Sequence, residues 1–256
     1  ITTNLTFGAS VNSIIHAGAK PVLVDVDKDT WNISPYLIEK AITPNTKAIM
    51  PVHLYGNPCD MVEIMAIAKK YDLLVIEDCA ESLGAMVGEQ KVGNFGDTGC
   101  FSFYPTKIFG AYGDGGFIST NNEKLYDRMK RIRFLGMEKK KMSSGHWNGK
   151  YYAVEHGTNS RLDEVHAAIL LKKLPYLDEW INRRREIAER YYNELKDTNI
   201  KLPKDVSLGA IVKEDKSILS PRGATVIEAG DIVVMFVPVK SMKKVEELLS
   251  VNLDFF

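Results

Sequence analysis

Lys107 is the residue whose type and position point most directly to chemistry. It follows the short apolar run at residues 99–103 and precedes a glycine-rich turn at 113–116, so its surroundings should hold its amine in place. A lysine held in this way can bind a carbonyl cofactor as a Schiff base. Asp78 ends another apolar run and offers an acid for a ring nitrogen of such a cofactor. The two residues together predict pyridoxal phosphate chemistry.

An α/β fold would place both residues at one edge of a sheet. Short apolar runs that suit strands covered on both faces alternate with segments of helical pattern, and these runs lie at residues 21–25, 48–52, 73–77 and 99–103. Ser34 before Pro35, and Asp60 with Glu63, predict the starts of two of the intervening helices. A repeat of strand and helix favours a mostly parallel sheet, whose ligands bind at the carboxyl ends of the strands.

The pattern changes in the last third of the chain. One long amphipathic helix is predicted from residue 160 to about 196, with a kink or break at Pro175. Short strands around turns follow residue 203, and a closing helix is predicted at 241–249. We therefore predict a large domain at 1–160, a linking helix at 161–202 and a small, strand-rich α+β segment at 203–256.

Composition excludes several classes of protein. The 33 basic residues balance the 33 acidic ones, so no overall charge attracts nucleic acid or an anionic membrane. No apolar run has the length of a membrane span, and the first residues do not form a leader. Cysteines 59, 79 and 100 form no CxxC pattern, and no pair among the five histidines has metal-ligand spacing. We expect a cytoplasmic protein without membrane insertion and without a metal site.

Six ordered motifs in residues 1 to about 202 resemble the DegT/StrS family of nucleotide-sugar aminotransferases. They lie at residues 18–25, 46–56, 76–82, 101–107, 113–116 and 159–163. The resemblance implies a fold-type-I enzyme that binds pyridoxal 5'-phosphate and works as a homodimer. It also implies that Lys107 binds the cofactor and shuttles a proton, while Asp78 pairs with the protonated ring nitrogen. Without the resemblance, Lys107 would be interpreted as a surface lysine and Asp78 as a helix cap.

The resemblance assigns four further residues to the cofactor. Ser102 would bind its phosphate, Phe7 would stack on its ring, and Asn159 would cross the dimer interface to the partner's phosphate. Glu81 would lie near the phenolic oxygen, where many relatives carry glutamine or histidine. The structural alternatives are a strand hydroxyl bonded to a neighbour for Ser102, a core side chain for Phe7 and a helix cap near residue 160 for Asn159.

The chain departs from the family pattern at both ends. Relatives begin with a Gly-Thr-x-Ala-Leu loop that holds the cofactor phosphate, and no such segment is present, which predicts weaker cofactor binding. Residues 207–213, 220–226 and 228–236 resemble part of a TrkA-type C-terminal regulatory domain.

The function predicted from these features is transfer of an amino group, with glutamate as donor, onto a keto sugar linked to a nucleotide. One alternative is a sugar dehydratase of the same family, in which histidine replaces the lysine; Lys107 disfavours it. A second is a scaffold or regulatory protein whose residues 203–256 bind a small ligand. A third is an inactive fragment.

Overall fold

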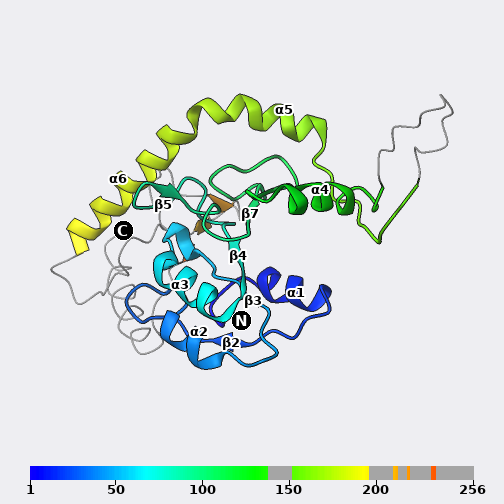
Figure 1. Cartoon of the computed structure of the whole chain (residues 1–256). Helices are drawn as coiled ribbons and strands as arrows, with labels where there is room; N and C mark the ends of the chain where they lie inside the picture. The colour runs from blue at the N-terminus through cyan, green and yellow to red at the C-terminus, as the bar shows by residue number, and fades with distance from the viewer. Residues whose placement is uncertain (138–151, 196–209, 213–217, 220–231, 235–256) are drawn as a thin grey trace. The chain divides into compact units, whose positions relative to one another are not determined.

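The computed structural model describes residues 1–137, 152–195, 210–212, 218–219 and 232–234 (Figure 1). The chain divides into two compact units, Ile1–Ser207 and Leu208–Phe256. We describe each unit by itself. The domain boundaries that we predict from the sequence remain predictions.

A four-stranded sheet occupies the centre of the first unit. Its strands in spatial order are β3 (Ala48–Ile49), β4 (Leu74–Asp78), β7 (Thr98–Ser102) and β8 (Gly116–Ser119). The first three strands are parallel, and β8 is antiparallel to β7. The short strands β1 (Thr2–Thr3) and β2 (Leu23–Val24) form a second parallel pair, which a parallel bridge from Thr2 to Met50 connects to the chain just after β3. The sheet is therefore mostly parallel, as predicted.

Two of the predicted strands are much shorter than their apolar runs. The runs at 21–25 and 48–52 form regular strands only at Leu23–Val24 and Ala48–Ile49. Each run contains a proline, Pro21 or Pro51, which has no N–H for the ladder of hydrogen bonds. The carbonyl of Pro51 still accepts the N–H of Asp78 at 2.8 Å, so pairing with β4 continues as an isolated bridge beyond the end of β3.

Four helices lie before residue 137 in the described part of the chain, and three of them begin at a side chain that caps the helix. The described helices before residue 137 are α1 (Gly8–His16), α2 (Pro35–Ala41), α3 (Met61–Tyr71) and α4 (Glu123–Ile132), together with the 3-10 turn η1 (Leu54–Gly56). Ser34 accepts a hydrogen bond from the N–H of Leu37, and Asp60 accepts one from the N–H of Glu63, which confirms both predicted helix starts. The buried face of α3 includes Ile64, which packs in one core cluster with Val75 of β4 and Ile38 of α2. α2 and α3 lie side by side in Figure 1.

The long helix predicted from residue 160 is divided and begins later. It consists of α5 (Glu164–Lys173), the 3-10 turn η2 (Leu174–Tyr176), which contains Pro175, and α6 (Leu177–Leu195). The start at residue 160 was wrong because the preceding segment pairs with other backbone. The N–H of Ser160 donates to the carbonyl of Arg133, and Asn159 forms an antiparallel bridge with Phe134.

Two further short strands, β5 (Met86–Val87) and β6 (Gln90–Lys91), form a hairpin after β4. The second unit contains an antiparallel sheet of β10 (Ile218–Leu219), β9 (Ala210–Val212) and β11 (Ile232–Val234). These strands confirm the short strands predicted after residue 203, whereas the predicted helix at 241–249 lies outside the described residues. Among the described helices, none has the length and apolar character to cross a membrane.

Candidate active site

The amine of Lys107 is paired with the carboxylate of Glu81. Lys107 lies in the turn after β7, where its N–H donates to the carbonyl of Tyr104 and its own carbonyl accepts from Gly110. Its Nζ donates to Glu81 Oε1 at 3.1 Å, and the two side chains are 23% and 34% exposed. Both groups are therefore partly open to solvent and available to a ligand, and the ion pair orients the amine of Lys107.

Asp78 ends β4 and is held by donors on both carboxylate oxygens. Its Oδ2 accepts a hydrogen bond from the hydroxyl of Ser10 at 2.7 Å, and its Oδ1 accepts the N–H of Ala80 at 3.1 Å. Ser10 is buried on α1, and its hydroxyl also lies 2.8 Å from that of Thr6. Ser10 was not among the residues predicted from the sequence, because Thr6 precedes α1 and no motif near Ser10 indicates a contact with Asp78.

The strands bring Asp78 and the segment of Lys107 to the same edge of the sheet. Asp78 lies beside Cys100 in the parallel register of β4 and β7, and the N–H of Cys79 donates to the carbonyl of Cys100. Glu81, three residues after Asp78, makes the connection to Lys107. The sequence prediction that these residues meet where parallel strands end therefore agrees with the geometry.

Phe7 is not a core side chain. It is the residue that precedes the first turn of α1, and it is 81% exposed. Because Ser10 in the following turn bonds to Asp78, the exposed ring belongs to the same end of α1 that contacts the candidate site. An exposed phenylalanine at this end of α1 is a ring on which a flat aromatic ligand could stack.

The structure connects Ser102 and Asn159 less directly with Lys107 and Asp78. The hydroxyl of Ser102, the last residue of β7, accepts the N–H of Tyr104 at 3.2 Å. Asn159 is exposed and does not cap α5, because Asp163 is the residue before that helix. Within the described residues, no hydrogen bond or ion pair joins either side chain to Lys107 or Asp78.

His53 and Glu77 form a fully buried pair next to the candidate site, since Glu77 is the residue before Asp78 on β4. The N–H of Cys59 donates to His53 Nδ1, so the other ring nitrogen, Nε2, carries the hydrogen and donates to Glu77 Oε2 at 3.1 Å. The carboxylate also accepts the N–H groups of the 93–96 turn, those of Gly93, Phe95 and Gly96, at 2.7–2.8 Å. Burial alone would raise the pKa of Glu77, but the bonds from His53 and from this turn outweigh it and hold that pKa below its usual 4.5.

The same pair belongs to a cluster that resembles a metal site. Ligand atoms of His53, Glu77 and Cys79 lie within 4.8 Å of one another. Hydrogen bonds already use both ring nitrogens of His53 and both oxygens of Glu77, and burial raises the pKa of the Cys79 thiol. A metal ion would have to displace four donors from a buried carboxylate, so we interpret the cluster as structural.

The turn at Tyr55 supplies a contact that no sequence motif indicated. Tyr55 has the left-handed backbone angles φ 56° and ψ 23°, and its N–H donates to Glu81 Oε2 at 2.9 Å. Burial and the charge of Glu81 raise the pKa of the Tyr55 hydroxyl to about 12. Glu81 therefore receives a backbone donor on one oxygen and Lys107 on the other.

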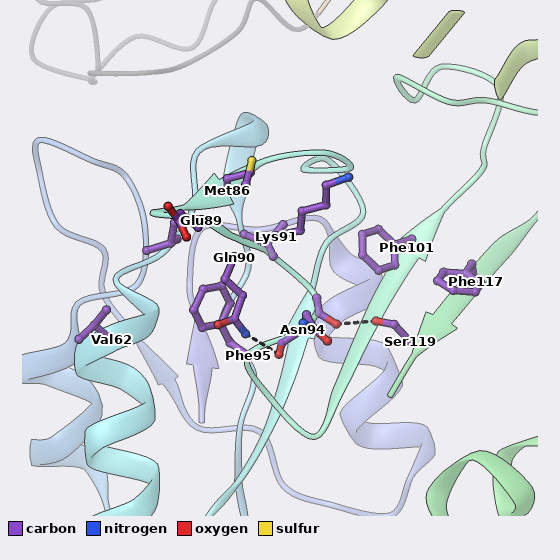
Figure 2. A pocket seen from close by; sticks show the side chains of 13 residues that line it. Val62, Met86, Glu89, Gln90, Lys91, Asn94, Phe95, Phe101, Phe117 and Ser119 are labelled. Carbon is purple, nitrogen blue, oxygen red and sulfur yellow. Dashed lines mark hydrogen bonds between the residues drawn. The ribbon is translucent and has the colours of Figure 1, made fainter. Parts of the chain in front are cut away.

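A pocket elsewhere on the first unit lacks this chemistry. It is lined by the β5–β6 hairpin, the 93–95 segment and side chains of β7 and β8, among them Phe101, Phe117 and Ser119 (Figure 2). None of the predicted site residues lines it.

Comparison with known proteins decides the family. A model of the DegT/DnrJ/EryC1/StrS aminotransferase family matches residues 1–216. The chain belongs to this family. A model of the TrkA-C domain matches residues 194–250, so both resemblances seen in the sequence are confirmed, with matches that overlap at 194–216. The fold is accordingly the α/β fold of the DegT-type aminotransferases.

Individual relatives are similar over about 200 residues. The dTDP-3-amino-3,6-dideoxy-alpha-D-galactopyranose transaminase of Aneurinibacillus thermoaerophilus is 50% identical over 203 residues, which are 79% of this chain and 53% of that protein. A pleiotropic regulatory protein of Geobacillus stearothermophilus is 48% identical over 197 residues, 77% of this chain and 50% of that protein. The chain thus spans about half the length of the curated relatives it matches.

A solved structure connects the fold with a cofactor. The NtdA protein of Bacillus subtilis, solved with bound PMP, is 36% identical, with a TM-score of 0.67 over 77% of this chain and 42% of that one. The residues of this chain fit such a group, because they include a partly exposed amine, a carboxylate held by Ser10 and an exposed aromatic ring.

Proposed function

We propose that this protein transfers an amino group, from glutamate, to a keto sugar linked to a nucleotide, with pyridoxal 5'-phosphate as cofactor. The observation that carries the proposal is the pairing of Lys107 with Glu81 at the edge of the sheet where Asp78 is held by Ser10. An amine, a fixed carboxylate and an exposed ring are the groups that hold this cofactor in aminotransferases of this kind.

Each candidate residue has a defined task in this proposal. Lys107 would hold the cofactor through its amine and Asp78 would bind the ring nitrogen, while Phe7 would cover the ring, Ser102 would bind the phosphate and Glu81 would lie near the phenolic oxygen. The partner's Asn159 would reach the phosphate across the interface of a homodimer. When bound, pyridoxal phosphate supplies an electron sink for bond breaking at the carbon that carries the amino group.

The chain's own residues prepare the charges for this chemistry. Hydrogen bonds from Ser10 and Ala80 hold the Asp78 carboxylate in one orientation, so its charge needs no rearrangement when a cationic ring nitrogen binds. Glu81 accepts a hydrogen bond from the Nζ of Lys107 at 3.1 Å, which holds the amine in place for the cofactor.

Two alternative functions can be distinguished from this proposal, one by the residue at position 107 and the other by an experiment. A dehydratase of this family would have histidine at position 107, where this chain has lysine. A regulatory role is favoured by the TrkA-C match at 194–250, and in that case the C-terminal unit would bind a small ligand. Calorimetry distinguishes the regulatory role, because a scaffold would show no saturable heat with pyridoxal phosphate.

Reductive trapping tests the proposal directly. The purified protein is incubated with pyridoxal phosphate, reduced with borohydride and digested, and the modified peptide is located by mass spectrometry. We expect the label on Lys107, together with transfer of ¹⁵N from labelled glutamate to a nucleotide-linked keto sugar. A label on another lysine, or on none, would contradict the assignment.

Asp78→Asn should reduce amino transfer strongly while leaving the fold intact. The amide has the shape of the carboxylate and can still accept from Ser10, but it lacks the charge that stabilises a protonated ring nitrogen. We expect the rate to fall by about 10²-fold or more. Steady-state kinetics measure this change, and Asp60→Asn, at the cap of α3, serves as the matched control.

A further inference from the structure

The turn that contacts Glu81 is held in an unfavourable backbone conformation. Tyr55 has a φ of 56° and is followed by Gly56 at 85°. A side chain with a β-carbon rarely adopts positive φ, because the β-carbon approaches the next carbonyl. Such a conformation persists only where the surrounding structure determines it, and it occurs often at functional sites.

The side chain of Asn32 is bonded to the backbone on both sides of Tyr55. It is 3% exposed, and its Nδ2 donates to the carbonyls of Asn57 and Pro58, each at 3.0 Å. Its Oδ1 accepts the N–H of Leu54 at 3.2 Å. One buried amide therefore binds the chain immediately before Tyr55 and again two and three residues after it.

A second amide strengthens the same connection. Asn57 Nδ2 donates to the carbonyl of Thr30 at 3.2 Å, two residues before Asn32. The segments around residues 30–32 and 54–58 are thus joined in both directions. With both ends held, the backbone between Leu54 and Asn57 has little freedom to relax at Tyr55.

The turn delivers one donor to the candidate active site. The N–H of Tyr55 lies 2.9 Å from Glu81 Oε2, and Glu81 Oε1 lies 3.1 Å from the Nζ of Lys107. The two oxygens of one carboxylate therefore connect a strained turn with the amine. Glu81 is a third exposed, so without the Tyr55 donor its carboxylate would be held only by Lys107, whose own stem is flexible.

We propose that Asn32 is a positioning residue for the amine of Lys107, acting through the left-handed turn at Tyr55 and the carboxylate of Glu81. The proposal rests on the proposed function in that Lys107 is the amine that holds the cofactor. A lysine side chain has a flexible four-carbon stem, so a fixed partner determines where its amine lies. Asn32 touches neither the amine nor the carboxylate; it sets the backbone that orients them.

Three variants isolate this role. Asn32→Ala removes all three bonds of the amide and should slow labelling of Lys107 by pyridoxal phosphate and borohydride about 10-fold, because small misplacements of reacting groups are costly. Tyr55→Gly should label at close to the wild-type rate, since glycine adopts positive φ without strain and keeps its N–H. The double variant should recover most of the rate lost in Asn32→Ala.

The recovery distinguishes positioning from general stabilisation. Glycine at position 55 relieves the strain but removes the ring that packs against Trp31 and adds entropy to the unfolded chain, so labelling should recover without a matching recovery of the melting temperature. Asn122→Ala, which removes the bonds that cap α4, is the matched control and should label like the wild type. If Asn32→Ala does not fold, Asn57→Ala is the milder variant, because it removes the bond to the Thr30 carbonyl and keeps the three bonds of Asn32; it should slow labelling less than 10-fold but measurably.

A measurement without cofactor tests the inference separately. The amide hydrogen at position 55 should exchange slowly in the wild type and at least about 10-fold faster in Asn32→Ala and in Glu81→Ala, because its bond to the carboxylate is lost. Labelling at the wild-type rate in Asn32→Ala, no recovery in the double variant, or unchanged exchange would each overturn the inference. If the wild type is not labelled at all, the proposed function fails, and the exchange result still decides the role of Asn32.

Discussion

Lys107→Ala should eliminate covalent capture of pyridoxal phosphate and reduce amino transfer by about 10²- to 10⁴-fold or more. The methyl group of alanine can neither bind the cofactor's aldehyde nor hold and return a proton. Lys107→Arg is the sharper variant, because a guanidinium keeps a positive charge beside Glu81 but does not lose its proton in proteins. We expect the arginine variant to fold normally and to be equally inactive.

A second lysine provides the control for this experiment. Lys70 also pairs with a glutamate, Glu39, at 2.7 Å, but it lies on the exposed end of α3. Lys70→Ala should therefore leave both trapping and turnover unchanged. Appreciable amino transfer by Lys107→Arg would show that the chemistry depends on another group.

Glu77→Gln should destabilise the fold by about 3 kcal/mol, measured by denaturant unfolding. The carboxylate of Glu77 accepts four hydrogen bonds in a fully buried position. An amide offers one accepting oxygen and turns an N–H group towards the donors of the 93–96 turn, so at least one buried donor is left without an acceptor. Because Asp78 is the next residue on β4, cofactor binding should weaken as well.

The effect should depend on pH in a defined direction. The pKa of Glu77 is lowered in the folded protein, so the stability it contributes is fully present above its unfolded value of 4.5 and is lost as the pH falls through the folded value. The difference in unfolding free energy between the wild type and Glu77→Gln should therefore be constant at neutral pH and shrink below pH 4.5. Glu39→Gln, at an exposed carboxylate, is the control and should change stability little. A difference that grows on acidification would contradict an ionised Glu77.

Local features of the chain were predictable from sequence where neighbouring residues determine them. The caps at Ser34 and Asp60, the division of the long helix at Pro175 and the parallel arrangement of β4 and β7 follow from residue type and periodicity. The approach of Asp78 to the Lys107 segment followed from the rule that parallel strands end at one edge.

Tertiary structure decided the contacts that give these residues their geometry. Ser10 reaches Asp78 across 68 positions of sequence, and nothing in the local pattern near either residue indicates the other. The donor to Glu81 is a backbone N–H of Tyr55, which every residue except proline possesses, so residue type carries no signal for it. The exposure of Phe7 and the start of α5 at Glu164 likewise depend on what other segments do.

The amino-acid sequence by itself thus determined the family and the mostly parallel α/β sheet, and it singled out Lys107 and Asp78 as candidates, because side-chain type and short-range periodicity record those properties. The tertiary structure alone decided how Asp78 is held by Ser10, how Glu81 is shared between Tyr55 and Lys107, and why His53 and Glu77 are buried together. Hydrogen-bond partners of this kind depend on distances between segments that are far apart in the chain, and only the packed backbone sets those distances.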